Sequence, residues 1–532
     1  MQRRATTDAD ARYAAARYAA EFLRLRQLAE RGVATAQHGL GFMYFNGQGV
    51  AQSYALAVAW YRQAAHAGLA QAQYNLGVMF QKGLGVAADM GEAANWYRLA
   101  AGQGYAAAQY NLGWLYAKGQ GVAQDSAQAR HWFAKAAGQG DAGAQNNLGM
   151  MYDSGKGVPQ DCAQAIMWYR KAAEQGYARA QFNLALRYDN GQGVARDGQQ
   201  ALAWFRKAAE QGYAPAQFNL ALRYDKGQDV APDAARAVQW YTLAAQQDHV
   251  SSQFNLGLAY DNGNGVARDD AQALRWYRRA AELGHAGAQN NLGQRYEHGQ
   301  GVVQDHGAAA HWYRQAAAAG HPAAQYHLAL LCEQGRGLPR DQQEALVWYR
   351  KAAEQGHLRA QFDLALRYEL GQGVPRDERT ALAWFRRAAD QEYVAAQFML
   401  GQIHDRADGP APDPIQANAW YRKAAEQGHP QACFTLGLRC DNGQGMARDF
   451  AQALSWYLAA ARQGHARAQL NAGLMFLAGQ GTPADAEQAW RWLSLAEQGG
   501  QAGAARHLAV AAARLAPRQL AALSAMPGLL PA

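Results

Sequence analysis

The chain has 532 residues, of which 49% are hydrophobic and 18% are charged, so it has ample apolar material for a core and is not generally disordered. Its 51 basic and 43 acidic residues leave a formal net charge of +8, which is mild for this length and indicates acidic partners only weakly. No apolar run approaches the roughly 20 residues that cross a bilayer, and no membrane span is predicted.

Residues 1–33 are predicted to form an N-terminal capping helix. The helical pattern covers residues 8–31 and ends on LAERG, in phase with the AEQG of later segments, but Arg24 stands where those segments have tryptophan. No apolar segment of signal-peptide length follows the basic N-terminus, and the chain has only four cysteines. Both features predict a cytoplasmic protein, although leaderless export would leave no mark in a sequence.

Residues 34–501 consist of thirteen consecutive repeats of a 36-residue segment. AQFNLALRYDNGQG at 180–193 nearly recurs at 216–229 and at 360–373. A fixed period of 20–50 residues is typical of stacked repeat proteins. Tryptophan marks the period at positions 60, 96, 132, 168, 204, 240, 276, 312, 348, 384, 420, 456 and 492.

Each repeat is predicted to be an antiparallel helical hairpin. In residues 180–212, apolar residues recur at helical spacing in two segments. Gly191 and Gly193 end the first helix, and Asp197 caps the second. Ala185 is glycine in most copies, which lets another helix approach closely. One hairpin buries too little surface to be stable alone, so the prediction is an all-α fold, an α/α superhelical solenoid of thirteen 36-residue helical-hairpin repeats.

After Trp492 the pattern fades. Residues 502–532 are predicted to contain one or two C-terminal capping helices and a tail.

Within the array, the sixth repeat replaces turn glycines with Asp229 and Asp248, and a later turn glycine is replaced by Glu392. The eleventh repeat reads HDRADGPAPDP at 404–414. We expect the solenoid to bend or to be locally softer near these sites.

The unit AQ(Y/F)NLGxxYxxGxGVxxD…AxxWYRKAAEQG resembles the SEL-like repeat family, a relative of the tetratricopeptide repeat. The resemblance implies an α-solenoid whose first helices line a concave side, and an adaptor of the bacterial type for protein complexes. One branch of the family has a cysteine pair eight residues apart, and β-lactamase activity has been attributed to it. Here Cys433 stands at one of these positions and Ala425 at the other, so neither the cross-link nor that activity is expected.

The candidate binding surface is the side of the first helices away from the core stripe. Helical geometry places Phe182, Leu186 and Asp189 beside one another there. The same trio recurs in other repeats, and asparagine recurs beside it. The predicted partner-binding residues are Phe182, Asn183, Leu186, Asp189, Phe218, Asn219, Leu222, Asp225, Phe254, Asn255, Leu258, Asp261, Asn291, Glu297, Tyr326, Glu333, Phe362 and Glu369.

An acid occupies the same position in nine consecutive repeats, in the last helical turn, where the macrodipole disfavours negative charge. One interpretation is an anionic series that faces a basic or amphipathic segment of a partner protein. The other, which we favour as the main cause, is structural: each carboxylate bonds the following turn or pairs with a loop arginine, namely Arg196, Arg268, Arg340, Arg376 or Arg448. The nine acids are Asp153, Asp189, Asp225, Asp261, Glu297, Glu333, Glu369, Asp405 and Asp441.

The other recurring side chains also have two interpretations each. The asparagines bind either a ligand's backbone, as in tetratricopeptide relatives, or the neighbouring repeat, whereas interhelical packing is favoured for the aromatics. Basic pairs such as Arg206 and Lys207 lie near the ends of the second helices, where a solvated convex face is favoured over a nucleic-acid surface. Histidines 249, 285, 321, 357, 429 and 465 are too far apart to share a metal, so turn packing is favoured.

No nucleotide-binding, zinc-protease, serine-hydrolase or paired-cysteine motif occurs. Catalysis needs a unique set of groups, and this sequence is built by repetition. We therefore expect no enzyme, no cofactor, no bound metal and no small-molecule substrate. The predicted function is a protein–protein interaction scaffold that binds partner segments in a concave groove. The alternative is a nucleic-acid-binding solenoid with a basic convex face, and the acidic series argues against nucleic acid in the groove.

Overall fold

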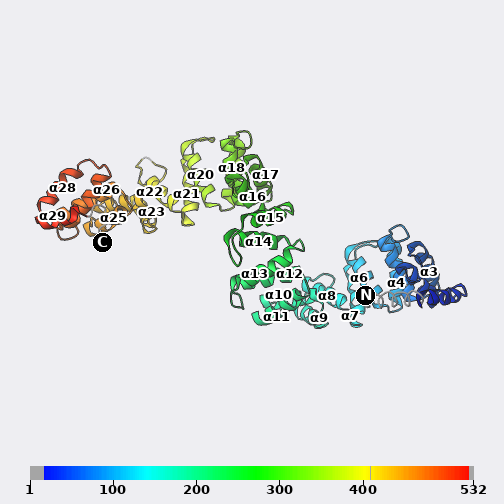
Figure 1. Ribbon diagram of the computed structural model, residues 1–532. Coiled ribbons are helices and arrows are strands. Elements are labelled where there is room, and N and C mark those ends of the chain that lie inside the picture. Colours follow the sequence, from blue (N-terminus) through cyan, green and yellow to red (C-terminus); the bar gives the residue numbers. More distant parts are fainter. Residues whose placement is uncertain (1–16, 408, 526–532) are drawn as a thin grey trace, which may run out of the picture. The chain divides into compact units, whose positions relative to one another are not determined.

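The computed structural model describes residues 17–407 and 409–525, which are helical with connecting turns and contain no strand. The chain forms two compact units, Met1–Trp276 and Tyr277–Ala532. Within each unit, helical hairpins follow one another along the chain (Figure 1). The predicted α-solenoid of 36-residue hairpins is confirmed.

Each repeat contributes two helices of nearly equal length. The first helices are α2 (Ala34–Asn46), α4 (Ala70–Lys82), α6 (Ala106–Lys118), α8 (Ala142–Ser154), α10 (Ala178–Asn190), α12 (Ala214–Lys226), α14 (Val250–Asn262), α16 (Ala286–His298), α18 (Pro322–Gln334), α20 (Leu358–Leu370), α22 (Val394–Asp405), α24 (Pro430–Asn442) and α26 (Ala466–Ala478). The second helices are α3 (Tyr54–His66), α5 (Met90–Gly102), α7 (Ser126–Gly138), α9 (Cys162–Glu174), α11 (Gly198–Glu210), α13 (Ala234–Ala245), α15 (Asp270–Glu282), α17 (His306–Ala318), α19 (Gln342–Glu354), α21 (Glu378–Asp390), α23 (Pro414–Glu426), α25 (Phe450–Ala461) and α27 (Ala486–Gln498).

Helices also flank the array. Residues 17–30 are helical, and the rest of the predicted N-terminal helix, residues 8–16, lies outside the described residues. At the other end, α28 (Ala504–Ala513) packs on α27, and α29 (Pro517–Ser524) follows it. The last part of the predicted tail, residues 526–532, also lies outside the described residues.

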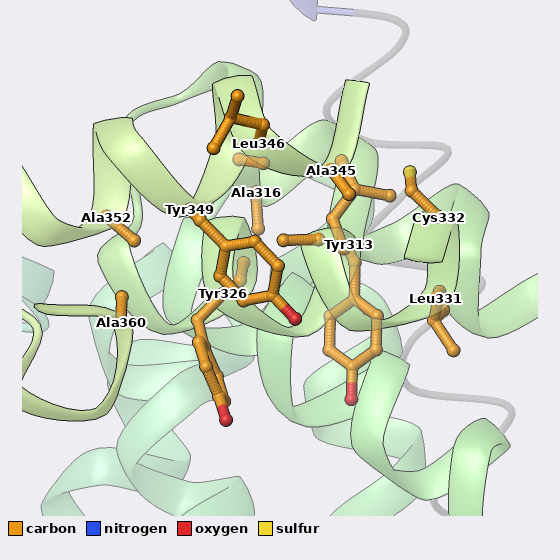
Figure 2. Packing of buried hydrophobic residues seen from close by; sticks show 14 of the residues in the cluster. Tyr313, Ala316, Tyr326, Leu331, Cys332, Ala345, Leu346, Tyr349, Ala352 and Ala360 are labelled. Carbon is orange, nitrogen blue, oxygen red and sulfur yellow. The ribbon is translucent and has the colours of Figure 1, made fainter. Parts of the chain in front are cut away.

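The two helices of a hairpin meet through a small residue that faces a buried aromatic ring. A Cβ atom added at Gly77 in α4 would lie 2.7 Å from the Tyr97 ring in α5. Ala185 in α10 takes the equivalent place, and both it and Phe205 are fully buried. Figure 2 shows the same kind of core in the second unit, where Tyr313 and Tyr349 are surrounded by alanines and leucines. Close approach of the helices therefore explains the small residue.

A buried glutamine in twelve of the thirteen first helices joins neighbouring repeats. Gln181 donates its Nε2 hydrogen to the Ala173 carbonyl oxygen at 3.1 Å, and Gln211 in turn donates to Gln181 Oε1 at 2.8 Å. Because a buried amide costs free energy unless it is bonded, this pairing explains why glutamine recurs here. Cys433 replaces it once and contacts the Ala425 carbonyl oxygen through Sγ at 3.4 Å. All four cysteines are free.

The predicted helix ends are confirmed. Gly191 follows α10 with φ of 65° and donates its N–H to the Arg187 carbonyl oxygen, which is the left-handed end that glycine adopts without steric cost. Asp197 precedes α11, and its side chain accepts a hydrogen bond from the Gln200 N–H at 2.9 Å. Both devices satisfy backbone groups that a helix end leaves unpaired.

In the irregular repeats, residues that replace turn glycines keep the left-handed backbone conformation. Asp229, Asp248 and Glu392 have positive φ values of 57°, 61° and 64°. In the eleventh repeat, α22 ends at Asp405 and is followed by Arg406 in an extended conformation. His404 is buried and donates Nδ1–H to the Ala411 carbonyl oxygen at 2.7 Å. A bend or softening at these sites stays a prediction.

In the sixth repeat, Asp229 replaces a turn glycine, and the residue that it contacts in the preceding repeat, Gly198, is itself a glycine. Elsewhere the second turn glycine lies against the start of the preceding second helix, and a Cβ atom at Gly85 would lie 2.4 Å from the Tyr54 carbonyl carbon. At the equivalent contact, Asp229 faces Gly198, and a Cβ atom at Gly198 would lie 2.1 Å from Asp229 Cγ. Gly198 thus leaves room for the Asp229 side chain.

Substituting Gly198→Ala is therefore expected to destabilise the protein by about 1–3 kcal/mol, as overpacking does. Gly138→Ala is the matched control, because no neighbouring atom lies within 4 Å of a Cβ atom there. Urea unfolding followed by circular dichroism would measure both changes. In the double variant Gly198→Ala/Asp229→Gly the clash is absent, so the double-mutant cycle should show a favourable coupling of about 1 kcal/mol. Simple additivity of the two substitutions would contradict this explanation.

Candidate functional site

The carboxylates of the acidic series contact the next repeat. Asp153 Oδ2 lies 2.6 Å from Arg187 Nη2, and Asp189 Oδ1 lies 2.6 Å from Arg223 Nη2. In the second unit Glu333 pairs with Arg367 at 2.6 Å. The partner in these three pairs stands on the following first helix, two positions before the acid of that repeat. Two more pairs of the second unit are Glu369 with Arg406 and Asp405 with Arg439.

A tyrosine hydroxyl on the second helix also contacts most of these carboxylates. Tyr349 donates to Glu333 Oε2 at 2.9 Å, and burial raises the pKa of Tyr349, so the hydroxyl keeps its proton. The Arg367 guanidinium lies over the same ring, with Cζ 3.9 Å from the centroid. Each complete cluster therefore combines a carboxylate, an arginine and an aromatic ring. Equivalent hydroxyl contacts join Tyr169 to Asp153, Tyr241 to Asp225, Tyr313 to Glu297, Tyr421 to Asp405 and Tyr457 to Asp441.

The predicted pairing of the carboxylates with loop arginines is wrong. Arg196 donates Nε–H to the backbone carbonyl oxygen of Asp189 at 3.1 Å, and Arg340 does the same to Glu333 at 3.0 Å. The last carbonyl groups of a helix lack intrahelical partners, so they are the acceptors nearest to the loop. The side-chain carboxylate instead faces the neighbouring repeat. Arg448 repeats the carbonyl contact, whereas Arg268 and Arg376 pair with Asp270 and Glu378.

The predicted aromatic residues pack between helices. The Phe182 ring centroid lies 5.7 Å from that of Phe205 and 5.4 Å from that of Tyr213. Tyr326 is buried and lies 4.8 Å from the His357 ring. These distances are those of ordinary aromatic pairs, in line with the packing interpretation. Phe218 contacts Tyr241 and His249, and Phe362 contacts Phe385 and Tyr393, in the same way.

The asparagine positions have several kinds of partner. Asn183 donates to Asn146 Oδ1 at 2.9 Å, and Asp363, which replaces asparagine, accepts from the Tyr326 hydroxyl at 2.9 Å. Both contacts join neighbouring repeats. Asn219 donates instead to the Pro215 carbonyl oxygen of its own helix at 2.9 Å. Asn291 accepts from Asn290 at 3.3 Å.

The recurring histidines cap the first helices. His357 Nδ1 accepts a hydrogen bond from the Ala360 N–H at 3.2 Å. Burial lowers the pKa of His357, which favours the neutral ring that can accept this bond. The sequence pattern predicted turn packing for these histidines and did not predict the helix cap. His249, His285, His321, His429 and His465 act in the same way.

The basic pairs of the second helices contact aromatic side chains. Lys207 Nζ lies 4.1 Å from the Trp204 ring centroid, and Arg206 donates to the Tyr224 hydroxyl at 3.4 Å. Cation–ring contacts of this kind recur along both units, at Lys135, Lys171, Lys351, Arg387 and Lys423. These contacts place each cation on a ring face, while side chains such as Arg206 and Lys207 remain exposed to solvent.

Some predicted site residues remain accessible and lie together. Leu222, Asp225, Asn255 and Leu258 line one cavity of about 340 Å³ in the first unit, and Asp225 is exposed. A second cavity, of about 520 Å³, is lined by Asp153, Asn183 and Met150 among others. Met150 lies two repeats before Leu222, at the equivalent position, and its side chain is 47% exposed.

The arginines that pair with the acids of the preceding repeat were not identified from the sequence. They occupy this position of the first helix in only five of the thirteen repeats, so the spacing in the sequence does not by itself show the pairing. Within residues 17–407 and 409–525, no group of three or more His, Cys, Asp or Glu side chains is arranged to hold a metal ion. Over the same residues, every helix is too short or too polar to cross a membrane.

Comparison with known proteins agrees with this architecture. The Sel1 repeat model matches thirteen consecutive segments that together cover residues 34–501. The crystal structure of c5321, a protective antigen present in uropathogenic Escherichia coli strains that displays an SLR fold, is similar at 37% identity and a TM-score of 0.66, covering 81% of this chain and 93% of that one. A Sel1 repeat protein from Oxalobacter formigenes is similar at 34% identity and a TM-score of 0.46, covering 58% and 92% of the two chains. A search of curated proteins found no match. With the family model matching nearly the whole chain, the protein belongs to the Sel1 repeat family.

Proposed function

We propose that this protein is a non-enzymatic interaction scaffold that binds basic or amphipathic segments of partner proteins on the face formed by its first helices. A Sel1 repeat solenoid is commonly a protein-interaction scaffold. The observation that carries the proposal is an apolar stripe along these helices that borders the core and stays partly exposed. At the position of Leu186, eleven of the thirteen repeats have an apolar residue, and the exceptions are Gln294 and Gln402.

This stripe stays partly open to solvent. Phe42 and Met150, which belong to it in the early repeats, are 48% and 47% exposed. Leu186, Leu222 and Leu258 are half-buried. An apolar series at a regular spacing, with an exposed carboxylate such as Asp225 one helical turn after Leu222, is complementary to an amphipathic segment that carries positive charge.

Nucleic-acid binding is not favoured. Many of the basic pairs on the second helices contact tryptophan rings or tyrosine hydroxyls, as Lys207 and Arg206 do. Binding of nucleic acid depends on neutralising phosphates with lysine and arginine, and a net charge of +8 over 532 residues is mild for that purpose. On the opposite helices the acids would repel phosphates.

Site-specific photo-crosslinking tests the proposal. A photoreactive amino acid at Leu222 or Leu258 is expected to crosslink a partner protein in the native cell. The matched control is Leu243 on α13, which is 43% exposed but belongs to a second helix. Asp189 is unsuitable for substitution in this test because it holds Arg223.

A charged variant completes the test. Leu222→Glu/Leu258→Glu should reduce capture of the crosslinked partner at least tenfold, whereas Leu243→Glu should leave it unchanged. Both changes lie outside the fully buried core, so circular dichroism can confirm that the fold is kept. Crosslinking at Leu243 but not at Leu222 and Leu258 would overturn the proposal.

A further inference from the structure

One repeat lacks the side chain that fills the contact between neighbouring first helices. The position that meets the acid of the preceding repeat holds arginine in five repeats and methionine, leucine or isoleucine in seven. Ala259 is the one small residue among the thirteen. The full set is Met43, Met79, Leu115, Met151, Arg187, Arg223, Ala259, Arg295, Leu331, Arg367, Ile403, Arg439 and Met475.

The preceding repeat shows what normally occupies this place beside a carboxylate. Arg223 is only 3% exposed, pairs with Asp189 at 2.6 Å, and has its Cζ atom 5.1 Å from the Phe205 ring centroid. Thus a guanidinium group is held between a carboxylate and an aromatic face. Arg367 is held by Glu333 and Tyr349 in the same manner in the second unit.

At Ala259 the carboxylate and the ring are present without the guanidinium group. Asp225 is equivalent to Asp189, and Tyr241 is equivalent to Phe205. The Asp225 carboxylate has long contacts with the Tyr241 hydroxyl, at 3.5 Å, and with Asn264 Nδ2, at 3.4 Å. Whereas Asp189 is half-buried under Arg223, Asp225 is exposed.

A cavity occupies the space of the missing side chain. Its volume is about 340 Å³, and Asp225, Tyr241, Asn255 and Ala259 are among the residues that line it. Ligand pockets span about 300–1,000 Å³, so this one lies at the small end, suited to a single side chain rather than to a larger molecule. Lys226 also lines the cavity, but in the part of the chain that the structure describes it forms no ion pair with Asp225 and so does not replace the arginine.

We infer that this cavity is an acceptor site for an arginine side chain of a partner protein, which takes the place that the chain's own arginine takes in the preceding repeat. The inference rests on the proposed function and names the partner's anchoring residue. Arginine fits better than lysine, because its planar group both pairs with a carboxylate and stacks on an aromatic ring. Leu222 and Leu258, which also line the cavity, would contact apolar residues beside that arginine.

A pair of peptides tests the site on the full-length chain. Each is acetylated, amidated and fluorescein-labelled. One has a single arginine flanked by leucines, and the other has citrulline, which is uncharged and of nearly the same shape, in place of arginine. Fluorescence anisotropy at physiological salt should show binding of the arginine peptide and at least tenfold weaker binding of the citrulline peptide. Equal affinity of the two peptides, or no binding of either, would overturn the inference.

Two variants address the site itself. Ala259→Arg should occupy the cavity from within and weaken binding of the arginine peptide at least tenfold. Asp225→Asn, at an exposed position where folding is not at risk, should weaken it by a similar factor. The matched control is Met475→Arg, which places the same side chain at the equivalent position of another repeat, after Asp441, and should leave peptide binding unchanged.

The results separate this inference from the proposed function. Crosslinking at Leu222 and Leu258 together with unchanged arginine-peptide affinity in Ala259→Arg and Asp225→Asn would reject the arginine site and keep the scaffold. Absence of crosslinking at both leucines would reject the scaffold face. Peptide binding that falls equally in Ala259→Arg and Met475→Arg would show a general charge effect and also reject the site.

Discussion

Replacing Arg223 with alanine is expected to lower the local free energy of unfolding around α12 and α13 by about 2–4 kcal/mol. Arg223 is 3% exposed and pairs with both Asp189 and Asp229 at 2.6 Å. Its removal leaves a cavity and two carboxylates without their cation. Removing one partner of a buried pair costs about 3–5 kcal/mol, and we expect less here because the two acids are 22% and 25% exposed.

Native-state hydrogen exchange is the appropriate measurement. In a repeat array each repeat contacts only its neighbours, so a single global unfolding transition would not isolate the local change. Arg223→Met is the matched control, because methionine fills the equivalent position in four other repeats. It should cost less than Arg223→Ala, since it restores packing but not charge. Equal protection of α12 amides in the wild type and Arg223→Ala would contradict the structural role of the pair.

Lowering the pH from 7 to 4 is expected to remove about 3 kcal/mol of stability through His327. His327 stands where most repeats have asparagine, and burial lowers its pKa to about 4. The ring stacks on Tyr313 with centroids 5.1 Å apart, and its Nε2 lies 3.2 Å from Gln294 Nε2. Glu297 opposes the shift, while His298, His321 and His357 add to it weakly.

The direction of this change in stability follows from whether the folded or the unfolded chain binds the proton more tightly. The pKa of an unfolded histidine is about 6.5, above the folded value, so the unfolded chain takes up the proton first. The contribution of His327 is thus fully present above pH 6.5 and is lost as the pH falls towards 4. Protonation of the folded chain would place a charge among aromatic rings away from water.

His327→Asn isolates this contribution. The variant restores the residue that most repeats have, so its stability should fall less between pH 7 and pH 4 than that of the wild type. Urea unfolding at both pH values, followed by circular dichroism, would measure the difference. His298→Asn changes an exposed histidine nearby and should keep the wild-type pH dependence. An unchanged pH dependence in His327→Asn would assign the acid sensitivity to other groups.

The amino-acid sequence alone determined the features that depend on neighbours along the chain or on the period. Gly191 ends a helix, and Asp197 caps the next, because each acts on backbone groups within a few residues. The small residue at Gly77 and the aromatic at Tyr97 recur with the period, so the close helix pair could be inferred from their pattern. Local geometry and repetition were sufficient for the hairpin and the solenoid.

Tertiary structure alone decided which side chain meets which across two repeats. Asp189 was expected to pair with Arg196 in the loop after its own helix, but it pairs with Arg223 on the first helix of the next repeat. The same stacking leaves Asp225 beside a cavity, because residue 259 is alanine. Such contacts depend on the register in which neighbouring hairpins pack and on side-chain direction. Neither is encoded in the spacing of one hairpin, so a charge that looks free in the sequence can be buried under the next repeat.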